Sequence, residues 1–127
     1  MNHIIVKFNS KKLGAILIHI IRQKATKQQI EEMLEELDPL IKLAVDIERH
    51  ILAGGGEMHA DCESVLLEDG SHQKDIWGAN WVPITQTIEF EALINIRPKQ
   101  QNRSMTIQDS AIKQQVETIA KKLLEGI

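Results

Sequence analysis

The sequence is short of three kinds of residue or segment, and each shortage narrows the class of protein. A single cysteine, Cys62, excludes an intrachain disulfide and fits a reducing compartment. Tyrosine is absent and aromatic residues make up only 3% of the chain, so the core must be mostly aliphatic. No apolar run reaches the length of a membrane span or of a secretory signal, and we therefore expect a cytoplasmic protein without a membrane partner.

An excess of positive charge is also missing. The formal net charge is −3, with acids and bases interspersed along the chain. Proteins that bind nucleic acid usually carry a basic stripe, so this composition argues against a nucleic-acid partner. The length of 127 residues, with no repeat and no internal linker, predicts one domain spanning residues 1–127.

Two segments have the signals of helices. Thr26 and Gln29 form a T-x-x-Q capping box, which predicts a helix start, and this helix should end before Pro39. Asp109 or Ser110 caps a last helix, because apolar residues follow at helical spacing. The apolar residues of this last helix are Ile112, Val116, Ile119, Leu123 and Leu124.

The rest of the chain has the signals of strands. Short apolar runs predict strands at 3–8 and 15–22, and alternation of apolar and polar residues predicts four more. These four cover residues 43–51, 57–67, 72–82 and 88–97. The predicted fold is α+β, a mostly antiparallel sheet in the order β-α-β-β-β-β-α with an additional first strand, and its helices pack on one face.

A turn at Gly54 and Gly55 would join the first two of these four strands, 43–51 and 57–67, as a hairpin. In this register the ionisable side chains share one face of the sheet, where like charges would oppose each other. The predicted cross-strand pairs are His50 with His59, Glu48 with Asp61, and Asp46 with Glu63.

The dipeptide Asp69-Gly70 predicts a second hairpin turn. In its register Trp77 lies opposite Cys62, and Trp81 lies on the same apolar side as Trp77. We therefore expect a buried Cys62 that packs beside Trp77.

The acidic face predicts two kinds of chemistry. Imidazole and carboxylate groups on neighbouring strands suit a zinc, manganese or iron ion, which is the one cofactor that the pattern suggests. The candidate metal ligands are Asp46, Glu48, His59 and Asp61. Two close carboxylates push their pKa values apart, so Glu48 and Asp61 are also a candidate catalytic pair. The alternative is the solvated face of an antiparallel sheet, with no ligand.

A second group of polar residues suits an anionic small molecule. Asn95, Arg97 and Arg103 lie close together in the sequence, and Asn80 falls on the same side as the acids. Arginine forks bind carboxylate or phosphate groups, so we take these four as candidate ligand-binding residues. The alternative is structural, with the arginines tying their loop to nearby acids.

Three motifs resemble a family of short bacterial and archaeal proteins described only as a domain of unknown function. They are G-G-E-x-H-A-D at 55–61, D-G-S-x-Q at 69–73 and I-N-I-R-P at 94–98. The resemblance covers residues from about 16 to 124, and it implies that residues 1–15 are an N-terminal extension. It implies no activity.

Two functions are therefore open, and the sequence leaves undecided whether the protein is an enzyme. One is the binding of a metal or an anionic small ligand through the acidic and histidine face of the 46–63 hairpin. The other is a non-catalytic protein–protein interaction module that forms a homodimer, because open sheet edges pair readily.

Overall fold

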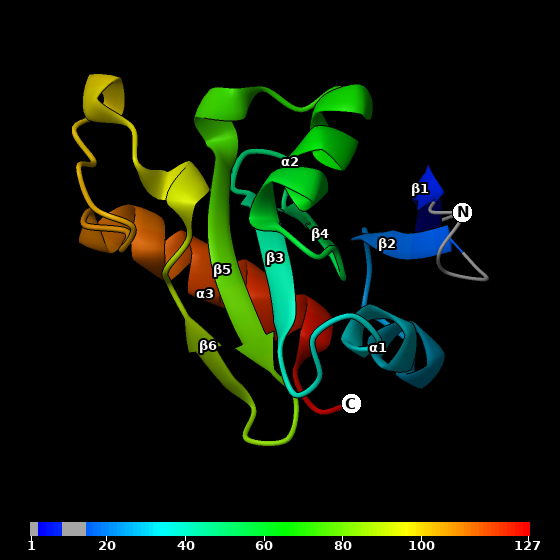
Figure 1. The fold of residues 1–127 in the computed structure, drawn as a ribbon. Helices are drawn as coiled ribbons and strands as arrows, with labels where there is room; N and C mark the ends of the chain where they lie inside the picture. The colour runs from blue at the N-terminus through cyan, green and yellow to red at the C-terminus, as the bar shows by residue number, and fades with distance from the viewer. Residues whose placement is uncertain (1–2, 9–14) are drawn as a thin grey trace.

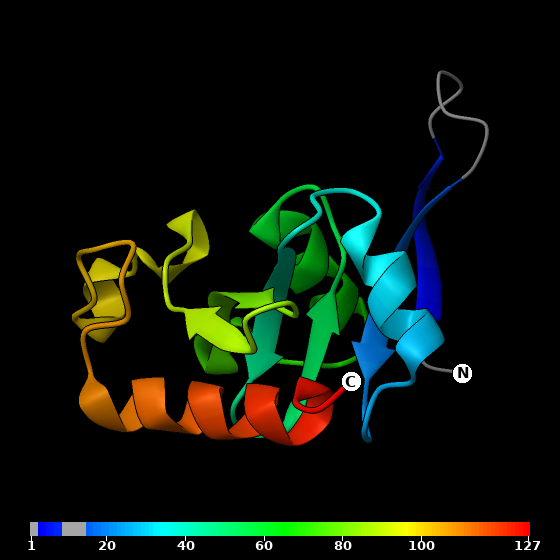
Figure 2. The same ribbon diagram turned by 90° about the horizontal axis from the view of Figure 1, so that it is seen from below.

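A six-stranded antiparallel sheet forms the centre of the fold, with helices on both of its faces (Figures 1 and 2). The computed structural model describes residues 3–8 and 15–127. The strands are β1 (His3–Phe8), β2 (Ala15–Ile21), β3 (Ile41–Asp46), β4 (Ile51–Gly54), β5 (Ile76–Val82) and β6 (Thr87–Glu89), arranged in the order β1-β2-β4-β3-β5-β6. The helices are α1 (Lys27–Leu34), α2 (His59–Glu68) and α3 (Ser110–Leu124), with short 3₁₀ turns at Gln73–Asp75, Leu93–Asn95 and Pro98–Gln100. The α+β class is thus confirmed.

Helices α1 and α3 cover one face of the sheet, and both begin where the sequence predicts. Thr26 and Gln29 exchange hydrogen bonds between side chain and backbone in a complete capping box. Asp109 accepts two backbone N–H bonds at the start of α3. The apolar sides of these helices pack against Trp77 and Trp81, which are buried together on this face.

Helix α2 covers the opposite face, and here two predictions are wrong. The segment 57–67 forms no strand, and the helices do not all pack on one side. The residues that α2 buries include Cys62, Val65 and Leu66, an i, i+3, i+4 spacing typical of a helix. The alternation of Met58, Ala60 and Cys62 with polar residues imitates a strand over one short stretch only.

The first hairpin therefore has different partners from those predicted. The predicted strand 43–51 breaks after Asp46, and the turn between β3 and β4 is made by residues 47–50. Asp46 fixes this turn, since one of its carboxylate oxygens accepts the backbone N–H groups of Glu48 and Arg49, each at 2.9 Å. The predicted Gly54-Gly55 turn is wrong because Gly54 is still paired with β3.

The dipeptide Asp69-Gly70 ends helix α2 and is not a hairpin turn. Gly70 has a φ of 103°, the left-handed conformation that commonly follows the last turn of a helix. Strand β5 then pairs with β3, with Val45 opposite Trp77. Cys62 is buried as predicted, but it does not pack beside Trp77 because the sheet lies between them.

The predicted strand 88–97 is also shorter than expected, because β6 ends at Glu89. Two side chains replace it along the first half of β5. The Asn95 amide accepts from the N–H of Gly78 at 2.7 Å and donates to its carbonyl at 3.0 Å. The Arg97 guanidinium donates to the carbonyl of Ile76. Side-chain groups thus satisfy backbone groups that a longer β6 would have paired.

The N-terminal segment extends the sheet at one edge. Strand β1 pairs with β2, so residues 3–8 of the predicted extension 1–15 belong to the sheet. Residues 1–2 and 9–14 of that extension lie outside the described residues. Among the helices that the structure describes, none is long and apolar enough to cross a membrane.

Candidate functional site

The four predicted metal ligands are not gathered around one point. Asp46 is buried beneath the β3–β4 turn and Glu48 is exposed on that turn. His59 and Asp61 lie in the first turn of α2. Across residues 3–8 and 15–127, no group of three or more His, Cys, Asp or Glu side chains is placed to hold a metal ion. The geometry therefore gives no support to metal binding.

The predicted catalytic carboxylates are not neighbours either. Glu48 lies at the turn end of the β3–β4 hairpin, whereas the Cβ of Asp61 lies close to Gly56, just beyond the other end. Asp61 accepts the backbone N–H of Met58 at 3.2 Å, which is a helix-capping role. The structure thus does not bring Glu48 and Asp61 together as an acid–base pair.

His59 and Asn80 are the two candidate residues that the structure does bring together. The Nε2 atom of His59 lies 2.8 Å from Oδ1 of Asn80 and 3.0 Å from the carbonyl oxygen of Ala79. A carbonyl oxygen can only accept, so Nε2 carries the proton of the ring. In the neutral imidazole, Nδ1 is then an acceptor.

The ring of His59 is held in its neutral form. Partial burial lowers the pKa of His59, and the charge of Lys42 lowers it further, while the hydrogen bonds to Asn80 and Ala79 act in the opposite direction. The ring also stands at the positive end of the α2 dipole, which disfavours a second proton. Nδ1 forms no hydrogen bond with the described residues, so its lone pair is available to a ligand.

His59 and Asn80 line a groove of about 420 Å³, which we call the His59 groove. Its other side chains come from β3, from the N-terminal end of α2 and from the segment after β6. They are Lys42, Met58, Ala60, Glu91, Ala92, Leu93, Ile94 and Met105. Met58, Leu93 and Met105 are exposed to 53%, 66% and 42%, an unusual exposure for such apolar side chains.

Charges of both signs flank the centre of this groove. Lys42 pairs across the sheet with Asn80, and Asn80 pairs with Glu89, so cation, amide and carboxylate follow one another on three neighbouring strands. Glu91 follows two residues later. Neither Lys42 nor Glu91 forms an ion pair within the part of the chain that the structure describes.

The other three predicted ligand-binding residues are placed elsewhere. Asn95 is fully buried and bonded to backbone groups. Arg97 donates to three backbone carbonyls, lies 3.4 Å from Glu63 and covers the ring of Trp77 at 4.8 Å. Arg103 is exposed on the loop before α3. These contacts of Arg97 are the ones that the structural alternative predicts, in which an arginine ties its loop to an acid.

Sequence reasoning missed Lys42 and Glu91. Their positions depend on the pairing of β3 with β5 and of β5 with β6, which puts residue 42 opposite 80 and 80 opposite 89, two residues before Glu91. The sequence offers two signals for that pairing, the alternation of residues 41–46 and of 76–82, but the misassigned strand at 57–67 took the place of β3 beside β5. His50 lies far from His59, in a separate pocket beside α3.

Fold and groove together define a small α+β protein with a half-buried, neutral histidine presented to an apolar groove. The chain belongs to the family described as "Protein of unknown function (DUF5674)", whose model matches residues 19–123. No curated protein and no solved structure matches the chain.

Proposed function

We propose that this protein binds a small apolar amino acid, or a ligand with the same groups, in the His59 groove. The ligand carboxylate is the anionic group, and it contacts Lys42. The ligand ammonium donates to Nδ1 of His59 and to the Glu91 carboxylate. Its apolar body covers the exposed side chains of Met58 and Leu93. We include a cytoplasmic location in this proposal.

The state of His59 is the observation that carries the proposal. The Nε2–H of His59 is already bound by two acceptors, so Nδ1 is the ring nitrogen left to interact with a ligand. Nδ1 can accept a hydrogen bond or a proton. An acceptor in a groove favours a ligand with an N–H or O–H donor. Lys42 on one side and Glu91 on the other favour a ligand that carries both charges.

Isothermal titration calorimetry with L-leucine tests the proposal. Two analogues of leucine each lack one of its charges. 4-Methylpentanoate lacks the ammonium group, and 3-methylbutylamine lacks the carboxylate. A hydrogen bond to a charged group is worth about 1.5 to 3 kcal/mol, so each analogue should bind at least about tenfold more weakly than leucine. Equal binding of all three compounds, or no binding of any, would refute the proposal.

Two variants assign the binding to this groove. Lys42→Met removes the charge but keeps an apolar stem, and it should weaken leucine binding while leaving 3-methylbutylamine binding unchanged. Lys74→Met is the matched control, because the side chain of Lys74 is 73% exposed and lies outside the groove. The same loss in both variants would show that the effect of Lys42 is not local.

Self-association through the same surface is a second candidate function. Met58, Leu93 and Met105 expose apolar surface, and a twofold axis would set Lys42 of one copy against Glu91 of the other. Light scattering after size exclusion should then show a dimer, and Leu93→Glu should convert it to a monomer. Ile84→Glu is the control, since Ile84 is 84% exposed and does not line this groove. A monomeric wild-type protein rules this candidate out.

A further inference from the structure

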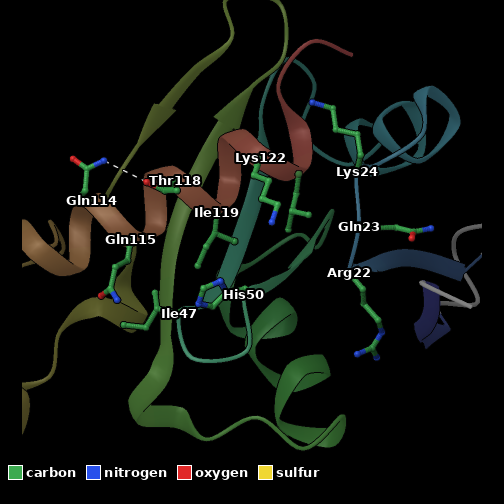
Figure 3. A pocket seen from close by; sticks show the side chains of 11 residues that line it. Arg22, Gln23, Lys24, Ile47, His50, Gln114, Gln115, Thr118, Ile119 and Lys122 are labelled. Carbon is green, nitrogen blue, oxygen red and sulfur yellow. Dashed lines mark hydrogen bonds between the residues drawn. The ribbon is translucent and has the colours of Figure 1, made fainter.

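A second pocket lies on the opposite side of the sheet, between α3, the β3–β4 turn and the segment that joins β2 to α1 (Figure 3). We call it the α3 pocket. Its volume is about 510 Å³, which falls within the range of pockets that hold small organic ligands. None of the residues proposed above for the amino-acid ligand lines it.

The floor of the α3 pocket is apolar. Ile119 and Leu123 are buried residues of α3, and Ile47 of the β3–β4 turn packs against the same core. Figure 3 shows Ile119 and Ile47 directed into the space between the helix and the turn. An apolar or planar ligand body fits this floor.

The rim of the α3 pocket is basic. Arg22, Lys24, His50 and Lys122 line it, and no Asp or Glu does. Such a lining favours an anion, because three of these groups, Arg22, Lys24 and Lys122, are cations and no acidic side chain offsets them at the rim.

Two of these four groups already have partners. Arg22 donates two hydrogen bonds of 2.8 Å to the Asp69 carboxylate, and Figure 3 shows its side chain directed away from the pocket centre. Lys24 donates to the backbone carbonyl of Glu125. Lys122 and His50 form no ion pair within the described part of the chain, and they approach the pocket centre from opposite sides of Ile119 (Figure 3).

The backbone places His50 in this position. Its φ is 58°, a left-handed conformation that few residues other than glycine adopt. The turn is fixed from the other side by Asp46, which binds two of its backbone N–H groups. The hairpin backbone therefore places residue 50 beside the pocket, which its side chain lines.

Polar, uncharged groups complete the rim. Gln23, Gln114, Gln115 and Thr118 offer amide and hydroxyl groups that both donate and accept. Gln114 donates to Thr118 at 3.3 Å, while the exposed side-chain amides of Gln23 and Gln115 form no hydrogen bond with the described residues. Figure 3 shows Gln23 directed away from the pocket centre, whereas Gln115 lies beside Ile47, so the Gln115 amide suits the hydrogen-bonding edge of a nucleobase.

We infer that the α3 pocket binds a nucleoside monophosphate, with the phosphate between Lys122 and His50 and the base over Ile119. The phosphate is a compact anion that matches the Lys122 ammonium and can accept an N–H of the His50 imidazole. The base supplies the planar body for the apolar floor and a polar edge for the Gln115 amide.

Titration of the full chain with three probes tests this inference: AMP, adenosine and inorganic phosphate. AMP should bind at least about tenfold more tightly than either of the others, because it alone engages both the basic groups and the floor. Amide resonances of the β3–β4 turn and of α3 should shift in ¹H–¹⁵N spectra. Inorganic phosphate binding as tightly as AMP would overturn the inference, and so would shifts confined to other elements.

The two neighbouring lysines of α3 provide a matched pair of variants. Lys122→Met should weaken AMP about tenfold and leave adenosine unchanged. Lys121→Met is the control, because Lys121 pairs with Glu117 at 2.9 Å and does not line the pocket. Equal effects of the two substitutions on AMP binding would overturn the assignment to this pocket. Since leucine is directed to the other face, its binding should be unchanged in both variants.

Discussion

Replacing Asn95 with alanine removes the side-chain amide that pairs the open half of β5. The N–H and the carbonyl of Gly78 then lose their close partner, and the carbonyl of Met105 loses one of its two donors but keeps the N–H of Ala92. Asn95 has no exposed surface, so water does not simply replace the amide. A buried polar group left unpaired costs about 1 to 3 kcal/mol. We expect Asn95→Ala to lower the free energy of unfolding by about 3 to 5 kcal/mol.

Urea unfolding followed by tryptophan fluorescence measures this loss, since Trp77 lies next to Gly78 in β5. With a denaturant slope of about 2 kcal/mol per M, a loss of about 3 kcal/mol lowers the midpoint by roughly 1.5 M. Gln23→Ala is the control, because this exposed amide has no hydrogen bond within the described residues, and its midpoint should not change. A loss below about 1 kcal/mol in the Asn95 variant would contradict the role given to the amide.

Asn95→Asp separates hydrogen bonding from volume. Aspartate keeps an acceptor for the N–H of Gly78 but turns a second oxygen toward the carbonyls of Gly78 and Met105. The charged carboxylate is disfavoured there, so its pKa in the folded state should lie above its unfolded value. The variant should therefore recover stability as the pH is lowered, because the protonated acid can donate again. An unchanged difference from wild type between pH 7 and pH 4 would contradict this reasoning.

Four other features of the fold can be tested by titration or substitution. Burial raises the pKa of Cys62 to about 12, so a thiol reagent at pH 8 should modify it only in the unfolded protein. The pKa of His59 is lowered in the fold, so the folded state binds fewer protons, and stability should fall as the pH drops below about 6.5; His59→Gln should remove this loss. Hydrogen bonds from two arginines lower the pKa of Asp69, so its stabilising effect is present at pH 7 and should disappear below about pH 4, which Asp69→Asn would reveal as convergence with wild type. Gly78→Ala should cost about 1 to 3 kcal/mol, because the added methyl group overlaps Ala92 and lies 3.0 Å from Ile94.

Each of these predictions has a result that contradicts it. Rapid modification of native Cys62 would mean that the thiol is not enclosed by α2 and the sheet. Parallel pH profiles of wild type and His59→Gln, or a constant gap for Asp69→Asn, would remove the assigned pKa shifts. A Gly78→Ala protein as stable as wild type would mean that the chain after β6 does not press against β5.

Local signals in the sequence predicted those elements whose ends are fixed by local contacts. The capping box of Thr26 and Gln29 and the cap at Asp109 are contacts between residues two or three apart, so the pattern alone specifies them. The shared face of Trp77 and Trp81 was also predictable, because the period of two in β5 does not depend on its partner strand.

Long-range pairing was not predictable in the same way. In 57–67 the alternation of Met58, Ala60 and Cys62 outweighed the helical spacing of Cys62, Val65 and Leu66, and the assignment to a strand then shifted every later pairing. The groove depends on that pairing. Lys42 and Asn80 are 38 positions apart in sequence and become neighbours only once β3 lies beside β5. Asn95 and Arg97 looked like ligand-binding residues because buried backbone groups and bound anions are recognised by the same polar side chains.

Asp69 binds two arginines, and this limits which ligands of the α3 pocket can also bind Arg22. Arg22 and Arg49 both bond this one carboxylate, at 2.8 Å, from segments on either side of α1 and β3. An incoming anion gains Arg22 only by outcompeting a resident anion, and Arg49 remains to satisfy Asp69 after Arg22 has left. A monoanion would thus leave Arg22 bound to Asp69, whereas a more highly charged ligand would draw Arg22 into the pocket. The α3 pocket would therefore select among anionic ligands by their charge.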